Sequence, residues 1–180
     1  MSIDRGMEKE TLGLAYSCVR AQQDYPTAFK DMQDRSAETY KKHSPKTNLK
    51  YGPGERNTYD FFPAKEKGAP TFIFIHGGYW QSCVKEDFSY VAEGPLAKGY
   101  NVILFEYTIA PVGTMTSIVQ ELYMFLNHLE DNLDQLGITK GQICLSGHSA
   151  GGHLPLVGKD HRVISTAIPI SPPVVLDPII

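Results

Sequence analysis

The 180-residue sequence lacks both a strong excess of charge and a long apolar run. Its 17 lysines and arginines against 20 aspartates and glutamates leave a formal net charge of −3, without a long basic run. Nucleic acid and anionic membranes are therefore not expected as partners. The expected partner is a small-molecule substrate. No apolar stretch approaches the about 20 residues needed to cross a bilayer, and the charged opening Met1–Glu10 does not resemble an export signal.

Cysteine is also scarce. Cys18, Cys83 and Cys144 are widely spaced, cannot all pair with one another, and show no C-x-x-C metal-binding pattern. This usage predicts a reducing, cytoplasmic setting. Hydrophobic residues make up 42% and charged residues 21%, which is an ordinary globular composition. We expect one domain over residues 1–180, with an N-terminal helical arm (1–46) and a sheet core (47–180).

Local patterns predict the first elements and one long helix. Composition favours a helix over Pro26–His43. Two short strands, Asn48–Tyr51 and Thr58–Phe62, are expected to form a hairpin through Gly52-Pro53-Gly54 at one edge of the sheet. Apolar residues at steps of three and four predict a helix over Thr114–Leu136, which ends before a glycine.

The sheet core is predicted from four short runs of apolar, β-branched or aromatic residues. Runs of this kind are typical of buried parallel strands. They are Thr71–His76, Asn101–Tyr107, Gln142–Ser146 and Val163–Ile170. Strands and helices alternating at crossover lengths predict an α/β fold, with a mainly parallel sheet covered by helices on both faces.

The most specific local feature is the pentapeptide Gly147-His148-Ser149-Ala150-Gly151, which directly follows a predicted strand. A nucleophile elbow is a tight strand-to-helix turn that raises a serine hydroxyl above the sheet, and it needs very small residues two before and two after the serine. The two outer glycines meet this need, so Ser149 is the candidate nucleophile. A motif this short arises by chance about one time in ten in such a glycine-rich chain, so the context has to support it.

That context is a second glycine motif, His76-Gly77-Gly78-Tyr79-Trp80, at the carboxyl end of another predicted strand. Open α/β sheets bind their ligands at this edge, so both motifs are expected to meet there. The candidate donors to a developing oxyanion are backbone N–H groups, those of Gly77, Gly78, Tyr79 and Ala150. A plain glycine turn with a core tryptophan is the alternative.

Three segments carry a family resemblance. His76-Gly77-Gly78-Tyr79-Trp80-Gln81, Tyr107-Thr108-Ile109-Ala110-Pro111 and Gly147–Leu154 resemble α/β hydrolases of the arylformamidase (kynurenine formamidase) group and their bacterial esterase relatives. The resemblance runs from about Tyr51 to Ser171, and the H-G-G-x-W element is its most specific part. It implies hydrolysis of N-formylkynurenine to kynurenine and formate in tryptophan breakdown, without a metal or an organic cofactor.

The implied mechanism uses an acyl-enzyme. Ser149 attacks the formyl or acyl carbonyl, and a histidine acts as general base. Trp80 and Tyr107 would offer aromatic surface for an aryl substrate, with ordinary core packing as the alternative for each. Cys144 is expected to be a buried small hydrophobic residue. Two other hypotheses are a general carboxylesterase and a non-catalytic α/β-hydrolase scaffold that binds a ligand or partner.

The acid and base of a triad are not evident in the sequence. In the family they follow the last two strands, whereas after the elbow this sequence offers only Asp160, Asp177, His153 and His161. His153 and the elbow's His148 are expected to be structural, and an Asp160–His161 dyad should lie at the wrong end of its helix. A metal hydrolase that uses His148, His153 and Asp160 is a further alternative, but no H-E-x-x-H or comparable ligand spacing supports it. We therefore expect a C-terminally incomplete hydrolase whose acid and base are not in the chain.

Three further features depart from a regular pattern. Pro155 should weaken the helix after the elbow because proline has no backbone N–H to donate. Glu106 ends an otherwise apolar strand, so its carboxylate is expected to be solvated or paired. As the last strand, Val163–Ile170 would form an open sheet edge, and a homodimer through that edge is one way to cover it.

Overall fold

The computed structural model describes residues 8–15, 17 and 23–176; Cys18 and Asp177 lie outside these ranges. The helices in chain order are α1 (Lys9–Ala15), α2 (Tyr25–His43), the 3-10 helix η1 (Lys85–Ala92), α3 (Glu93–Ala97), α4 (Met115–Asp131), α5 (Leu133–Leu136) and α6 (Ala150–Gly158). The strands are β1 (Lys46–Lys50), β2 (Thr58–Phe62), β3 (Thr71–Ile75), β4 (Asn101–Phe105), β5 (Ile143–His148) and β6 (Thr166–Ile170). None of the helices described has the length and apolar character of a membrane span.

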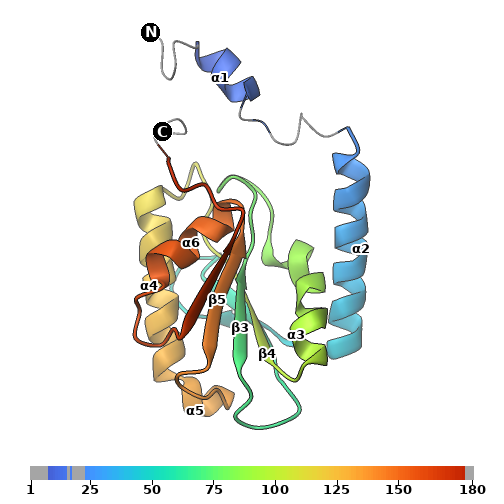
Figure 1. Ribbon diagram of the computed structural model, residues 1–180, viewed down its shortest axis with the longest axis vertical. Helices are drawn as coiled ribbons and strands as arrows, with labels where there is room; N and C mark the ends of the chain where they lie inside the picture. Colours follow the sequence, from blue (N-terminus) through green and yellow to red (C-terminus); the bar gives the residue numbers. More distant parts are fainter. Residues whose placement is uncertain (1–7, 16, 18–22, 177–180) are drawn as a thin grey trace.

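The sheet has the order β1-β2-β4-β3-β5-β6, which confirms the predicted α/β fold (Figure 1). Strands β4, β3, β5 and β6 run parallel to one another. The hairpin of β1 and β2 is antiparallel and joins the sheet at the β4 side, so it forms an edge as expected. The carboxyl ends of the parallel strands therefore share one edge, where the two glycine motifs leave the sheet.

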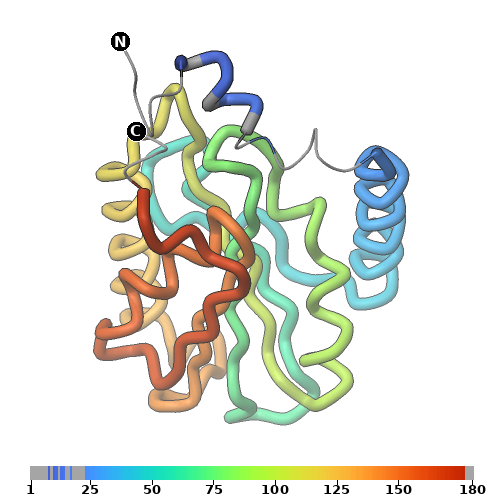
Figure 2. The backbone as a smooth tube through the Cα atoms, turned by 45° about the horizontal axis from the view of Figure 1, so that its top comes forward, coloured from blue at the N-terminus to red at the C-terminus, as the bar shows by residue number. Residues whose placement is uncertain are grey.

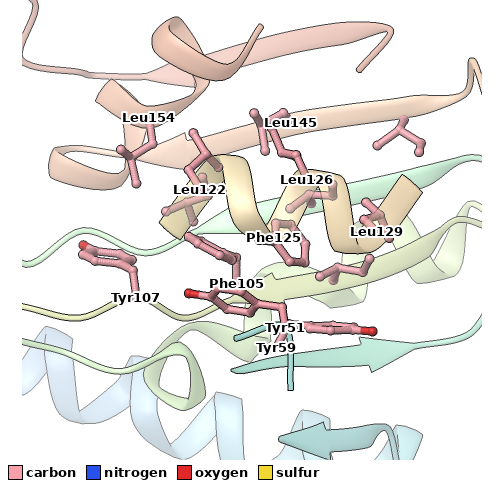
Figure 3. Close-up of a cluster of buried hydrophobic side chains, with 14 of the residues drawn as sticks. Tyr51, Tyr59, Phe105, Tyr107, Leu122, Phe125, Leu126, Leu129, Leu145 and Leu154 are labelled. Carbon is pink, nitrogen blue, oxygen red and sulfur yellow. The ribbon is translucent and has the colours of Figure 1, made fainter. Parts of the chain in front are cut away.

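Helices cover both faces of the sheet, as Figure 1 shows. On one face, Leu122, Phe125 and Leu126 of α4 pack on Tyr51 and on buried side chains of the central strands (Figure 3). On the other face, a smaller cluster joins η1 to the sheet; its members are Phe62, Phe74, Phe88, Ala92, Val102 and Leu104. Helix α2 lies outside this second layer (Figure 2), where the Ser36 hydroxyl donates to the Asp87 carbonyl at 2.9 Å.

The long predicted helix is in fact two helices. Its start is as expected, because the Thr114 hydroxyl accepts from the Ser117 N–H at 3.2 Å and the Ser117 hydroxyl accepts from the Thr114 N–H at 2.8 Å. At Asn132 the α-helical pattern breaks. The Asn132 N–H bonds to the Leu129 carbonyl at 3.1 Å, and its side-chain amide donates to the His128 carbonyl at 2.7 Å. An asparagine that competes for backbone groups in this way separates α4 from the short α5.

The last predicted strand begins later than expected, because the chain turns before it. The Ile164 N–H donates to the His161 carbonyl at 2.9 Å, so β6 is confined to Thr166–Ile170. It forms the sheet edge beside β5. Pro169 lies within this edge strand, where a missing N–H is tolerated and also removes one group that a further strand could pair with. Dimerisation through β6 stays a prediction.

Candidate functional site

The register of the sheet places the two glycine motifs in contact. Strands β3 and β5 are neighbours, and Ile75 pairs with Gly147. Each motif therefore leaves the sheet at the same level. A Cβ atom built on Gly77 would lie 3.2 Å from the Ser149 Cβ and 3.0 Å from the His148 carbonyl oxygen. The loop after β3 thus lies directly against the elbow.

Ser149 has the strained backbone of an elbow. Its φ of 53° and ψ of −124° are rarely adopted by a residue with a side chain. Its N–H donates to the Ile170 carbonyl of β6 at 2.9 Å, and its carbonyl accepts from the Gly152 N–H at 2.8 Å. Ala150 begins α6, and N–H groups in a first helical turn have no partner within the helix. The sequence predicted the start of this helix, and α6 runs to Gly158 with Pro155 inside it.

The glycines of the elbow permit very close backbone contacts. A Cβ atom on Gly151 would lie 2.1 Å from the His76 carbonyl oxygen and 2.4 Å from that of Ile75. One on Gly147 would lie 2.2 Å from the Gly151 carbonyl oxygen. Any side chain at these positions would push α6 away from β3, so the small residues are a packing requirement.

The loop after β3 makes a tight left-handed turn. Gly78, Tyr79 and Trp80 all have positive φ, of 110°, 57° and 56°. The Gly78 carbonyl accepts hydrogen bonds from the Gln81 N–H (3.0 Å), the Ser82 N–H (3.0 Å) and the Ser82 hydroxyl (2.9 Å). The turn is therefore held by several hydrogen bonds rather than by side-chain packing alone.

Glu106 lies buried beneath this loop and is paired, one of the two expected alternatives. Only 4% of the residue is exposed. Its Oε1 accepts from His76 Nε2 (2.9 Å), the Arg56 guanidinium (2.7 Å) and the Tyr107 N–H (2.9 Å), and its Oε2 accepts from the Lys85 N–H (3.0 Å). Burial alone would raise the pKa of Glu106, but the His76 hydrogen bond and charge, with Arg56, outweigh it and lower the pKa.

Arg56 was not singled out from the sequence. Besides Glu106 it binds the Tyr107 carbonyl through Nε at 2.8 Å and the Cys83 carbonyl at 2.8 Å. It therefore ties the loop between β1 and β2 to the loops after β3 and β4. The available signal was Glu106 itself, because a carboxylate in an apolar strand needs a nearby cation.

Replacing Glu106 by glutamine is expected to lower stability at neutral pH, by an amount that shrinks on acidification. The folded-state pKa of Glu106 lies below its ordinary value of 4.5, so the ionised group contributes stability above that value. The contribution is lost as the pH falls through the folded-state pKa. Urea unfolding of wild type and Glu106→Gln at about pH 7 and about pH 3 measures the difference. An equal difference at both pH values would contradict this account.

The two expected pocket aromatics differ in position. Tyr107 is fully buried, with its ring stacked on His76 at 4.6 Å between centroids and its hydroxyl donating to the His76 carbonyl at 3.1 Å. It is therefore a core residue and not a pocket residue, because the loop after β3 covers it. Trp80 does line a cavity of about 240 Å³, together with Tyr79, Gln81, Ala110, Gly113, Thr114, Met115, Ile118 and Leu176.

The cavity is mostly apolar, and the indole nitrogen of Trp80, one of its lining residues, is buried. Trp80 is 5% exposed, and its Nε1 finds no acceptor among the residues described. Its ring stands edge-on to that of His153, at 6.1 Å between centroids. His153 Nδ1 is likewise buried without a partner in the described ranges.

Within the part of the chain that the structure describes, no acid–base pair is assembled at Ser149. Among residues 8–15, 17 and 23–176, none forms a hydrogen bond with its hydroxyl. Asp160 and His161 follow the far end of α6, where Asp160 pairs with Lys159 at 2.9 Å and His161 Nε2 contacts Asn127 Oδ1 at 3.2 Å. His148 is exposed. In the same ranges, no three His, Cys, Asp or Glu side chains are grouped as a metal ion would require.

Cys144 is half-buried rather than fully buried. It lies on β5, three residues before Gly147 of the elbow motif, and its burial raises the pKa of its thiol. A raised pKa keeps the sulfur protonated and unreactive. The expected role as a small apolar residue is compatible with this position.

The mainly parallel sheet with helices on both faces and a strand-to-helix elbow is the fold of the α/β hydrolases. A crystal structure of a proposed thioesterase from a Silicibacter species matches with a TM-score of 0.80 and 28% identity, over 91% of this chain and 64% of that one. Within this class, the chain belongs to the BD-FAE family, which matches residues 60–162.

Curated relatives share part of the chain. A kynurenine formamidase of Drosophila melanogaster is 34% identical over 109 residues, which is 59% of this chain and 35% of that protein. An esterase of Gibberella moniliformis is 27% identical over 112 residues, 62% of this chain and 35% of that protein. This chain thus spans about a third of the length of these relatives.

Proposed function

We propose that this chain carries the nucleophile and oxyanion groups of a serine hydrolase that cleaves a small aryl formamide or ester through an acyl-enzyme. The observation that carries the proposal is the contact between Gly77 and Ser149, with the serine in strained elbow geometry. In this proposal the N–H groups of Gly77, Gly78, Tyr79 and Ala150 surround the carbonyl oxygen as it becomes negatively charged.

The reaction takes place in two steps. The Ser149 oxygen bonds to the substrate carbonyl carbon, its proton passes to a histidine base, and the C–N or C–O bond to the leaving group breaks as that group takes up the proton. Water then attacks the acyl-enzyme, which releases the acid and frees the serine. The structure supports the proposed roles of the nucleophile and the oxyanion groups. The histidine base is not among the described side chains that form hydrogen bonds near Ser149, because none of them bonds to its hydroxyl.

The cavity beside Trp80 supports an aryl substrate. Its apolar lining, which includes Met115 and Ile118 beside Trp80, suits an aromatic ring. The similarity to a kynurenine formamidase supports a formamide substrate such as N-formylkynurenine, whose hydrolysis is a step of tryptophan breakdown. The similarity to an esterase supports a carboxylic ester. We further propose that the protein acts in the cytoplasm on a small-molecule substrate.

Labelling with a fluorophosphonate tests the nucleophile. We expect slow modification at Ser149 and none in Ser149→Ala, because an elbow with oxyanion donors retains about 10³- to 10⁴-fold of catalysis over water without a working triad. Ser146→Ala, which changes a buried serine of the same strand, is the matched control and should label like wild type. Brisk stoichiometric labelling would show that a base does act on Ser149, and no labelling would contradict the proposal.

Two assays separate the substrate classes. Release of formate from formylkynurenine, compared with hydrolysis of short acyl esters of a naphthol, distinguishes a formamidase from a general carboxylesterase. A higher kcat/KM for the formamide supports the first, and a preference for the esters supports the second.

A non-catalytic scaffold is the second candidate function. It is favoured by one observation, that no side chain in the described ranges forms a hydrogen bond with the Ser149 hydroxyl. A chain that is inert to every acyl substrate and to fluorophosphonate, yet still binds aryl ligands at the Trp80 cavity, would establish it. Quenching of the fluorescence of the single tryptophan reports such binding directly.

A further inference from the structure

The chain that follows β6 starts beside the elbow. Ile170 is the last residue of β6, and its carbonyl accepts a hydrogen bond from the Ser149 N–H at 2.9 Å. Ser171 comes next with a positive φ of 46°, a backbone conformation that turns the chain. Residues 171–176, which we call the post-β6 segment, therefore leave the sheet at the candidate nucleophile.

Gly152 lets the post-β6 segment pass close to the elbow helix. A Cβ atom built on Gly152 would lie 2.8 Å from the Ile170 carbonyl oxygen and 3.3 Å from the Pro172 Cβ. A side chain at this position would push the segment away from α6. The segment is also stiff, because a proline fixes its own φ and favours an extended backbone in the residue before it, and Pro172 is followed by Pro173.

Leu176 is the point at which the post-β6 segment reaches the cavity beside Trp80. Val174 and Val175 are 70% and 63% exposed. Leu176, in contrast, is half-buried, packs against the core cluster that contains Trp80, and lines the cavity. The segment therefore contributes one apolar side chain to the cavity wall.

The rest of the wall belongs to the firmly held part of the fold. The Ala110 N–H donates to the Trp80 carbonyl at 2.7 Å, which joins the loops after β3 and β4. Ile118 of α4 is 1% exposed. Of the described residues that line the cavity, Leu176 alone comes from the post-β6 segment. A change of side chain at Leu176 can therefore alter the cavity without disturbing the loops that carry the other lining residues.

The cavity is small for a ligand site. Its volume is about 240 Å³, whereas small-molecule sites usually measure roughly 300–1,000 Å³. Atoms that exceed the space in a closely packed apolar site are costly to accommodate. With Leu176 in place, the cavity therefore suits a compact aryl group and excludes one with a bulky apolar substituent.

We propose that Leu176 is a specificity-determining residue, which closes the cavity beside Trp80 and so limits the size of the aryl group on a substrate attacked by Ser149. The inference rests on the proposed function and adds the size class of its substrate. Leu176 acts by occupying space, and it has no part in the bond-making steps.

Ligand binding tests the inference without catalysis. The single tryptophan of the chain lies in the cavity wall, so its fluorescence reports ligands bound beside Leu176. The two ligands are phenol and 4-tert-butylphenol, which differ by one bulky apolar substituent. In Leu176→Ala we expect the affinity for 4-tert-butylphenol relative to phenol to rise about 10-fold or more, because one methylene that does or does not fit an apolar pocket changes discrimination about 10- to 200-fold. Leu176→Phe should shift the ratio in the opposite direction.

Val175→Ala is the matched control. This neighbouring residue is 63% exposed, so its truncation should leave the ratio of the two affinities as in wild type. An unchanged ratio in both Leu176 variants, an equal shift in Val175→Ala, or no response of Trp80 to either ligand would overturn the inference. If Leu176→Ala does not fold, Leu176→Phe, which keeps an apolar residue in place, decides by itself.

The same pair of aryl groups links the inference to the reaction. The ratio of kcat/KM for 4-tert-butylphenyl acetate to that for phenyl acetate should shift in the Leu176 variants as the affinity ratio does. Failure of wild-type Ser149 to react with either ester or with a fluorophosphonate would overturn the proposed function. The fluorescence measurement would still decide whether Leu176 limits what the cavity holds.

Discussion

Replacing Gly151 by alanine is expected to abolish labelling of Ser149 and to destabilise the fold by more than about 3 kcal/mol. The added methyl group would lie 2.1 Å from the His76 carbonyl oxygen and 2.4 Å from the Ile75 carbonyl oxygen. Both are backbone atoms of β3 and its end, so no side chain can turn aside to make room. Either α6 or the loop after β3 has to move. Urea unfolding and fluorophosphonate labelling measure the two losses.

Gly13→Ala is the matched control for this substitution. Gly13 lies in α1, and beyond its chain neighbours and its own helix nothing lies within 4 Å of the place where its Cβ would be. Because alanine favours a helix over glycine by about 1 kcal/mol, this variant should be as stable as wild type or slightly more so. If Gly151→Ala unfolds at the same urea concentration as Gly13→Ala, the close packing of elbow and β3 is wrong.

Lys85→Met is expected to destabilise the protein by about 3–5 kcal/mol at neutral pH, because it leaves a buried carboxylate without its cation. The side chains of Lys85 and Asp60 are 2% and 0% exposed, and their charged atoms lie 3.4 Å apart. Burial already raises the pKa of Asp60, against the hydrogen bonds from Tyr40 and Asn48 and the charge of Lys85. Removing the lysine raises that pKa further. The loss should therefore shrink as the pH falls through the folded-state pKa of Asp60, where the protonated acid no longer needs a cation.

Lys140→Met serves as the control, because Lys140 forms a surface ion pair. Its side chain is 61% exposed and pairs with Glu130 at 3.0 Å. Exposed pairs contribute about 1 kcal/mol or less. Thermal and urea unfolding of the two variants should therefore differ clearly. A Lys85→Met protein as stable as Lys140→Met would show that the Lys85–Asp60 pair contributes little to the packing of η1 on β2.

Elements with a strong periodic pattern were predicted well from the sequence. The apolar runs of β3 and β4 predict strands because residues buried on both faces leave a continuous hydrophobic signal. Ends of elements were predicted less well. Asn132 divides a helix whose apolar spacing continues into α5, and the turn at Ile164 shortens the last strand, since both depend on local hydrogen bonds that compete with the regular pattern.

The candidate site was predicted in part. Ser149 and the Gly77 loop were singled out because an elbow and an oxyanion loop need glycine at fixed spacing. Tyr107 was misplaced, because a tyrosine next to a motif has the same local sequence whether it lines a pocket or packs beneath it. Its hydrogen bond to the His76 carbonyl and its stacking on the His76 ring exist only once β3 and β4 pair.

The sequence by itself determined the order of strands and helices and the two glycine motifs, because chain-local spacing and residue size decide these features. Tertiary structure alone decided which groups meet. Arg56, His76 and Glu106 are far apart in the chain. Arg56 and His76 both reach the buried carboxylate of Glu106 only because β4 lies between β2 and β3. The desolvated charge then needs both partners, and this need, which no local pattern encodes, fixes the loop that faces Ser149.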